Sequence, residues 1–268
     1  MTEKRRRNGP DAERGVSESI GFILIFSLVV TGIGIVTLYG YPLLVKQQMG
    51  TDIRIMEKTF IVLQNDVKSL VYKNVPYKET SLKVGGGVLS ARNVSVTPQN
   101  ITLYVDDNQV TGPFNPFYPG ELRFDTDLGD TAIVLENGAV ITASKTAGGS
   151  AMLAEPRWYN DSQTGTFVIS LIRFTTDDPV SRTGVGTIGL RLTGSYYNVT
   201  TLNPGETASV QYNPGPDPEN DYSVAWDNYL RQTMGLEKYS YESGYRYRLP
   251  SDTTSIVITE YTIEILSL

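Results

Sequence analysis

Residues 20–44, IGFILIFSLVVTGIGIVTLYGYPLL, contain no charged side chain. A helix of roughly 20 mainly apolar residues crosses the hydrocarbon core of a bilayer. The stretch therefore predicts a membrane-spanning helix over residues 16–45, with a distortion near Pro42, which lacks a backbone N–H. It is longer than the roughly 7–15 apolar residues of a cleaved secretory signal, and no small-residue cleavage site follows it.

The residues on the two sides of this helix carry opposite charge. Residues 1–15 hold five basic and three acidic side chains, whereas residues 46–268 hold 18 basic and 25 acidic ones. Because the basic flank of a membrane helix stays in the cytoplasm, we expect a single-pass protein of the cell membrane with a cytoplasmic N-terminus and an extracellular C-terminal domain. An acidic exterior gives no support for a nucleic-acid partner.

The chain contains neither cysteine nor histidine. This excludes disulfides, zinc sites built from these residues, and catalytic triads that use histidine. No other activated nucleophile is recognisable, so we expect no enzyme activity and no cofactor. Asp125, Asp127 and Asp130 could offer oxygen ligands to Ca²⁺, but their spacing fits a solvated turn better, and we expect no metal. The GxGxxG match at residues 184–189 opens no helix and therefore predicts no dinucleotide site.

The segment before the apolar stretch reads RGVSESIGF, from Arg14 to Phe22. It resembles the N-terminus of archaeal type IV pilins and pilin-like proteins, which carry a class III signal peptide. The resemblance implies that a prepilin peptidase cuts between Gly15 and Val16 on the cytoplasmic side. It also implies that the retained helix anchors the subunit and later forms the core of a filament. The resemblance covers residues 14–45 only, and an uncleaved single-pass anchor is the alternative.

Glu18 lies at the start of the helix that such a cut would leave. It is the third residue after the proposed cut, whereas bacterial pilins place their glutamate fifth. For this reason we do not transfer the bacterial pairing of that glutamate with a neighbouring N-terminal amine. A carboxylate in the first turn is also favoured by the helix dipole in any protein.

Residues 46–75 are predicted to form a second, amphipathic helix. Its apolar residues recur at spacings of three and four, which is typical of one helical face: Ile53, Met56, Phe60, Leu63, Val67 and Leu70. Packing of this face against the following domain is favoured over a coiled-coil stalk, because the stripe spans fewer than three heptads.

From residue 76 the apolar pattern changes to a period of two, with Gly and Pro in the intervals. This predicts an α+β protein whose extracellular domain is all-β and sandwich-like, over residues 76–212 with a C-terminal part at 213–268. Asn137-Gly138 predicts a hairpin turn, and the apolar run 167–174 predicts a strand buried on both faces. One short helix is expected at residues 222–234, ended by Gly235.

Two groups of residues are candidate surface sites. Four N-x-S/T sequons predict N-glycosylation in a secreted domain, and they are Asn93, Asn100, Asn160 and Asn198. The 17 tyrosines and two tryptophans suggest a carbohydrate-binding face, for which Tyr196-Tyr197 and Tyr245-x-Tyr247 are the exposed candidates. Tyrosine is also common in β-domains for packing alone, and that alternative is favoured.

These observations predict a membrane-anchored, pilin-like subunit, of the minor-pilin kind given its large head, that serves surface-filament assembly or adhesion. Its expected partners are the membrane, sister or related pilin subunits and prepilin peptidase. The alternative is a permanently anchored cell-envelope protein that displays a β-rich binding domain. An adhesive role and archaeal origin follow from the resemblance rather than from spacing or composition, whereas glycosylation is predicted by the sequons as well.

Overall fold

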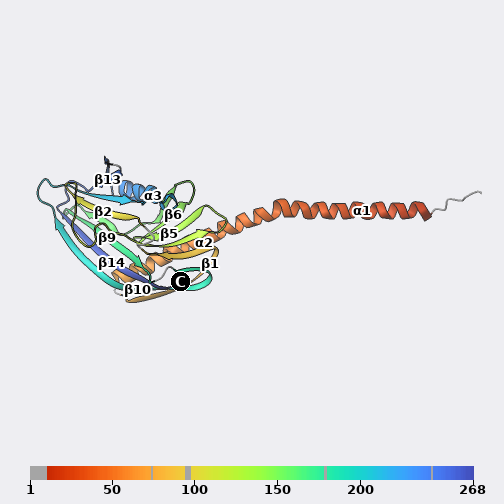
Figure 1. Ribbon diagram of the computed structural model, residues 1–268, viewed down its shortest axis with the longest axis horizontal. Helices are drawn as coiled ribbons and strands as arrows, with labels where there is room; N and C mark the ends of the chain where they lie inside the picture. Colours follow the sequence, from red (N-terminus) through yellow and green to blue (C-terminus); the bar gives the residue numbers. More distant parts are fainter. Residues whose placement is uncertain (1–10, 74, 94–97, 178–179, 243) are drawn as a thin grey trace, which may run out of the picture. The chain divides into compact units, whose positions relative to one another are not determined.

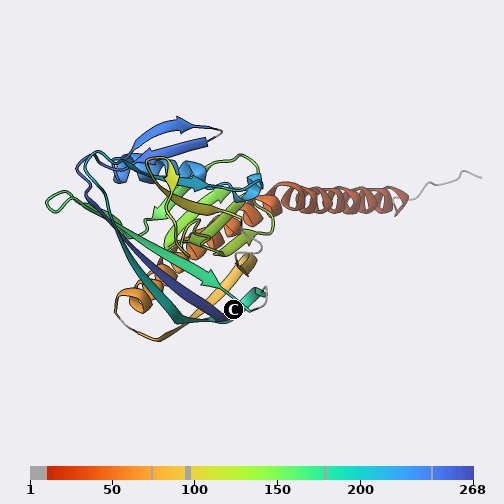
Figure 2. The same cartoon turned by 60° about the vertical axis from the view of Figure 1, so that its left-hand side comes forward.

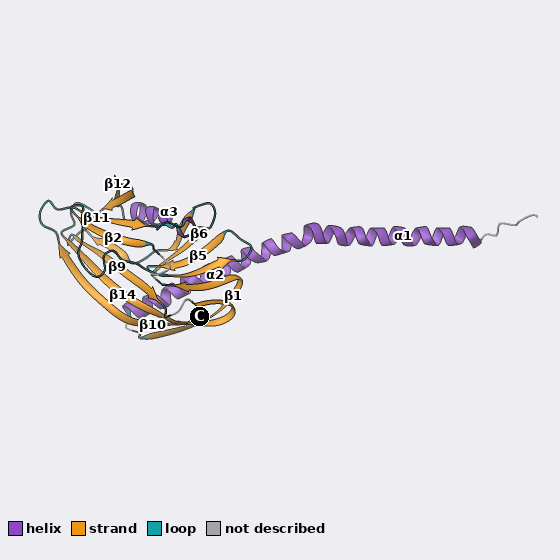
Figure 3. Ribbon diagram, in the orientation of Figure 1, coloured by secondary structure: helices purple, strands orange, loops and turns teal. Residues whose placement is uncertain are grey.

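The computed structural model describes residues 11–73, 75–93, 98–177, 180–242 and 244–268 (Figure 1). The chain divides into two compact units at the junction between Thr51 and Asp52. The N-terminal unit is helical, and the C-terminal unit is rich in strands (Figure 3). The α+β class predicted from the sequence is therefore confirmed.

The N-terminal unit consists of α1 (Asp11–Ile35), a π-helical segment η1 (Val36–Gly40) and the first turns of α2 (Tyr41–Tyr72). The helical stretch that begins at Ser19 is long and apolar enough to cross a membrane. The distortion expected near Pro42 takes the form of η1, in which the N–H of Tyr41 donates to the carbonyl of Val36, five residues back. In the uncut chain α1 begins at Asp11, so Glu18 lies within it, and a helix start at Glu18 after processing stays a prediction.

The C-terminal unit contains a nine-stranded and a five-stranded sheet. The large sheet has the order β7-β6-β5-β4-β1-β10-β14-β9-β8, and the small sheet has the order β12-β13-β11-β2-β3. The strands of the large sheet are β1 (Tyr77–Arg92), β4 (Glu121–Thr126), β5 (Thr131–Glu136), β6 (Ala139–Ser144), β7 (Ser150–Ala154), β8 (Trp158–Asp161), β9 (Thr166–Thr175), β10 (Val180–Thr201) and β14 (Ser255–Ser267). Those of the small sheet are β2 (Asn100–Val105), β3 (Asn108–Gln109), β11 (Ala208–Asn213), β12 (Glu237–Tyr241) and β13 (Gly244–Arg248).

From Asp52 to Tyr72, α2 packs on one face of the large sheet (Figure 2). Its predicted apolar stripe is buried from Met56 to Leu70, with Phe60, Leu63, Val67 and Leu70 fully inaccessible to solvent, while Ile53 is partly buried. They contact apolar residues of β1, β4, β5, β9, β10 and β14 in one core cluster. Burial of each such side chain stabilises the fold by roughly 1.5–3 kcal/mol. Packing against the domain is confirmed, and the coiled-coil stalk is excluded for this face.

The other face of the large sheet packs against the small sheet and against the short helix α3 (Ser223–Asn228). Strand β9 contributes to both cores, because Phe167 and Ile169 point to the small sheet while Ile172 and Phe174 point to α2. The domain thus has three layers: α2, the large sheet, and the small sheet with α3. The sandwich-like prediction holds for the two sheets, and the predicted packing of the amphipathic helix adds α2 as the third layer.

The predicted turn at Asn137-Gly138 joins β5 to β6. Both residues have positive φ, 48° and 73°, as a two-residue type I′ hairpin requires. The buried side chain of Asn137 accepts a hydrogen bond from the N–H of Ile172 at 2.8 Å, and Gln64 of α2 donates to the carbonyl of Gly138 at 2.6 Å. The turn is therefore fixed both to the sheet and to the helix.

The helix predicted at residues 222–234 is present as α3 followed directly by a π-helical segment η3 (Tyr229–Thr233), after which Gly235 adopts φ 68°. A 3-10 turn η2 (Pro218–Asn220) precedes it. Strand β14 lies between β10 and β9 in the large sheet, and β9 runs parallel to it. Residues 213–268 are therefore an integral part of the C-terminal unit.

Candidate functional site

The hairpin β12–β13 forms one edge of the small sheet and concentrates aromatic and cationic side chains. Lys238 pairs with Tyr247 and Ser240 pairs with Tyr245 across the two strands. Because side chains alternate along a strand, these four residues share one face of the hairpin. The opposite face carries Glu237, Tyr239, Tyr241, Arg246 and Arg248.

On the first face, a single carboxylate is surrounded by two cations and a phenol. The ammonium of Lys238 lies 2.8 Å from Asp227 of α3, and Arg231 of η3 lies 3.4 Å from the same carboxylate. The hydroxyl of Tyr247 donates to Asp227 at 2.8 Å. Partial burial opposes ionisation, but the hydrogen bonds from Lys238 and Tyr247 hold the pKa of Asp227 below its usual value. The cluster therefore carries a net positive charge within an acidic protein.

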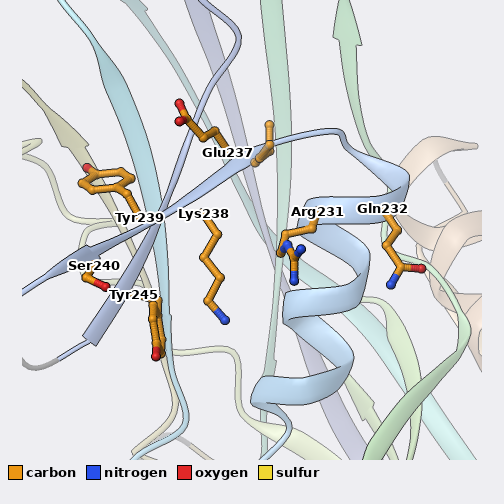
Figure 4. Close-up of a pocket in the computed structure, with 8 residues that line it drawn as sticks. Arg231, Gln232, Glu237, Lys238, Tyr239, Ser240 and Tyr245 are labelled. Atoms are coloured by element: carbon orange, nitrogen blue, oxygen red, sulfur yellow. The ribbon is translucent and has the colours of Figure 1, made fainter.

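Two hollows adjoin this cluster, and Lys238 and Tyr245 line both of them. The first has a volume of about 570 Å³ and is also lined by Arg231, Gln232 and Ser240 (Figure 4). The second has a volume of about 490 Å³, and its polar lining includes Gln211, Asn213 and Ser223. In Figure 4, Lys238 and Tyr245 extend from the hairpin into the space beside η3, on the side where Arg231 lies.

The opposite face of the hairpin fixes its position on the sheet. The guanidinium carbon of Arg246 lies 3.5 Å from the ring centroids of both Tyr104 and Tyr241. Arg246 is 5 % exposed and forms an ion pair of 2.9 Å with Asp107. A guanidinium stacked between two rings is a favourable cation–π arrangement, especially where it is desolvated. The contacts of Arg246 with Tyr104 and Asp107 thereby attach the hairpin to β2 and to the turn after it.

The aromatic residues singled out from the sequence differ in their exposure to solvent. Tyr245 is 55 % exposed, whereas Tyr247 is buried, so the prediction of an exposed Tyr245-x-Tyr247 pair is wrong for Tyr247. The predicted exposure of Tyr196 and Tyr197 is confirmed. The two tryptophans, Trp158 and Trp226, belong to the core between the sheets. Sequence reasoning missed Asp227, Arg231 and Lys238, although the spacing of four between Asp227 and Arg231 is a recognisable helical ion-pair signal.

The four sequons differ in how accessible their asparagines are. Asn160 is exposed in β8, whereas Asn93, Asn100 and Asn198 are partly buried. At two of the sequons the threonine hydroxyl donates to the asparagine side chain, from Thr102 to Asn100 at 3.1 Å and from Thr200 to Asn198 at 3.2 Å. Glycosylation stays a prediction at all four, and Asn160 offers the freest amide. The middle and last residues of the Asn93 sequon lie outside the described part of the chain.

The other sequence candidates form no shared site. Asp125 is paired with Arg123 at 2.9 Å, while Asp130 accepts a hydrogen bond from the N–H of Thr146 at 2.8 Å. The described residues contain no cluster of three or more acidic side chains that could hold a metal ion. The GxGxxG match lies within strand β10. Gly15 and Val16 lie within α1, where the side chains of residues 11–18 are outside the described part, so the processing site stays a prediction.

Two glutamates lie side by side in the core near the candidate site. Glu121 of β4 and Glu136 of β5 are direct cross-strand partners, and each is 1 % exposed. Tyr222 donates to Glu121, and the indole N–H of Trp226 donates to Glu136, each at 2.9 Å. Burial and the neighbouring Glu121 raise the pKa of Glu136 to about 8. A dissolved substrate has no access to this pair, so it joins α3 to the large sheet rather than forming a reaction site.

The guanidinium of Arg123 compensates the negative charge of Glu121, one of the two buried glutamates. It is buried, donates to the hydroxyl of Tyr222 at 2.8 Å, and also hydrogen bonds the side-chain oxygen of Asn220. Burial raises the pKa of Glu121, while the guanidinium of Arg123 opposes that rise. The polar network therefore links β4, β5, η2 and α3, and its charge state depends on pH.

The chain belongs to the family DUF7289, a family of unknown function, which it matches over residues 14–263. The matched residues include both the apolar helix and most of the β-rich unit. No curated protein and no solved structure matches the chain.

Proposed function

We propose that the chain is a membrane-anchored, pilin-like subunit that presents its β-rich unit outside the cell and assembles with sister subunits through its N-terminal helix. The proposal assigns it no catalytic activity. It is supported by the sequence resemblance of residues 14–45 and by one structural observation, which is the contrast between the two halves of the long helical segment.

The apolar residues of the first half are solvent-exposed on every side. Phe22, Leu28 and Leu38 are each 70 % or more exposed, and they lie on different sides of the helix. A helix that is apolar all round requires an apolar environment, such as a bilayer or a bundle of other helices. The second half instead buries a single stripe against the large sheet. A pilin-like subunit needs both properties, because its helix moves from the membrane into a filament core while the head stays folded.

Processing at Gly15-Val16 is the step that separates this proposal from a permanent anchor. The cut would remove the basic residues 4–7 together with the first residues of α1, and it would leave Glu18 in the first turn of the new helix. The new N-terminus would then enter an apolar bundle without the arginine cluster, whose burial would be costly.

The test is intact mass and N-terminal sequencing of the protein isolated from its native membrane. A chain that begins at Val16 supports processing, and a Gly15→Leu variant should then retain the full N-terminus. Gly32→Leu, which changes a glycine of the apolar helix outside the segment 14–22, serves as the control and should still be processed. A wild-type chain that keeps residues 4–7 would refute the pilin-like proposal and leave the permanent anchor.

A further inference from the structure

We propose that the two hollows beside the β12–β13 hairpin form a binding site for an acidic saccharide, with Tyr245 as its stacking platform and Arg231 and Lys238 as its carboxylate-binding cations. The site belongs to the folded head. It does not depend on whether the chain assembles into filaments.

The charge of the first hollow favours an anion. Arg231 and Lys238 share the single carboxylate of Asp227, so one positive charge is left without an equal partner. Glu237 also lines the hollow, but its carboxylate is engaged by Arg248 at 2.9 Å. The side chain of Arg231 is 53 % exposed, and its ion pair with Asp227 is long at 3.4 Å. Its remaining N–H groups are therefore available to a carboxylate, which a guanidinium binds through parallel hydrogen bonds.

The exposed ring of Tyr245 favours a ligand with an apolar face. The ammonium of Lys238 lies 4.0 Å from the ring centroid and fixes the ring by a cation–π contact. More than half of the Tyr245 surface remains exposed between the two hollows. A sugar ring offers C–H groups to such a surface and hydroxyls at its edge. A small inorganic anion would use the cations but not the ring.

Neutral hydrogen-bonding side chains surround the ring and suit the hydroxyls of a sugar. Gln232 and Ser240 lie in the first hollow, and Gln211, Asn213 and Ser223 lie in the second. Each hollow falls within the roughly 300–1,000 Å³ typical of small-ligand sites. Because Lys238 and Tyr245 line both hollows, we expect an oligosaccharide to extend along Tyr245 from one hollow toward the other, with its carboxylate on the side of Arg231.

The experiment is a titration of the full chain in detergent micelles with trigalacturonate, compared with its methyl ester as a neutral ligand of the same shape. The acid should bind at least about tenfold more tightly than the ester at low salt, and the difference should shrink at high ionic strength. Arg231→Gln should weaken binding of the acid about tenfold and leave the ester nearly unaffected. Tyr245→Ala should weaken both ligands.

Matched surface variants serve as controls. Arg191 is 52 % exposed and ion-paired with Glu264, and Tyr159 is 50 % exposed, so Arg191→Gln and Tyr159→Ala should leave both affinities unchanged. All variants alter partly exposed side chains, and an unchanged thermal melt verifies the fold. The proposal is overturned if the acid does not bind at millimolar concentration, if the ester binds equally well, or if Arg191→Gln weakens binding as much as Arg231→Gln.

Discussion

At Glu136, folding is coupled to protonation in the pH range around neutrality. Its pKa rises from an ordinary 4.5 to about 8 in the folded chain. Between these values the folded state holds a proton that the unfolded state has released. The free energy of unfolding should therefore fall as the pH rises from about 4.5 to 8, by an amount on the order of a few kcal/mol.

The variant Glu136→Gln should remove most of this pH dependence, because the amide keeps an oxygen that can accept from Trp226 but cannot ionise. At pH 8 and above we expect it to be more stable than the wild type. Glu79→Gln, at an exposed position of β1, should leave the profile unchanged. Denaturant unfolding at several pH values measures the effect. Equal slopes for the wild type and Glu136→Gln would contradict the assignment.

Gln64 is a polar residue on the buried face of α2, and its role is to satisfy two backbone carbonyls. It donates to Gly138 at 2.6 Å and to Glu155 at 2.9 Å. Gln64→Ala should lower the free energy of unfolding by about 1–3 kcal/mol, since both buried carbonyls would lose their partner. Asn65→Ala, at the next and exposed helical position, should change it by less than about 0.5 kcal/mol. Similar losses for the two variants would show that helix propensity, not the carbonyl contacts, sets the cost.

At the scale of the element, alanine substitutions at three turn glycines distinguish the cost of backbone strain from the cost of steric overlap. Gly138 lies between β5 and β6, and Gly148 and Gly149 lie between β6 and β7. A Cβ on Gly138 would lie 2.9 Å from Ile172 Cδ1, and the residue also has positive φ. Gly148 has φ 64° with open space around it, and Gly149 has open space and no positive φ. We expect destabilisation by alanine in the order Gly138, Gly148, Gly149, with the first costing more than about 1 kcal/mol. Thermal melts of the three variants measure it, and an equal cost at Gly138 and Gly148 would rule out the overlap.

The elements that could be predicted from the sequence are those whose signal is local. The stripe from Met56 to Leu70, the turn at Asn137-Gly138 and the run 167–174 each carry their own period or turn chemistry. The order of the strands in the large sheet has no such local signal, because β14 pairs with β10 and β9, which are distant from it in the sequence. The candidate binding site was missed for the same reason. Tyr245 was recognised, but Asp227, Arg231 and Lys238 converge only through the packing of η3 against the hairpin.

At the scale of the whole molecule, the apolar helix and the acidic head predict a defined orientation in the membrane. The basic N-terminal residues favour a cytoplasmic start, and the absence of cysteine makes the chain suited to a labelling test. Gln163, in the exposed turn between β8 and β9, leaves the Asn160 sequon intact when it is replaced by cysteine.

In intact cells, Gln163→Cys should react fully with a membrane-impermeant maleimide, and permeabilisation should not increase the labelling. Thr2→Cys, tested in a Gly15→Leu background so that the N-terminus is retained, should react only after permeabilisation. Because no native thiol competes, the two results together determine the side on which each unit lies. Labelling of Gln163→Cys only after permeabilisation would place the head in the cytoplasm. That result would exclude both the filament subunit and the surface anchor, since each requires the β-rich unit and its hairpin site to face outward.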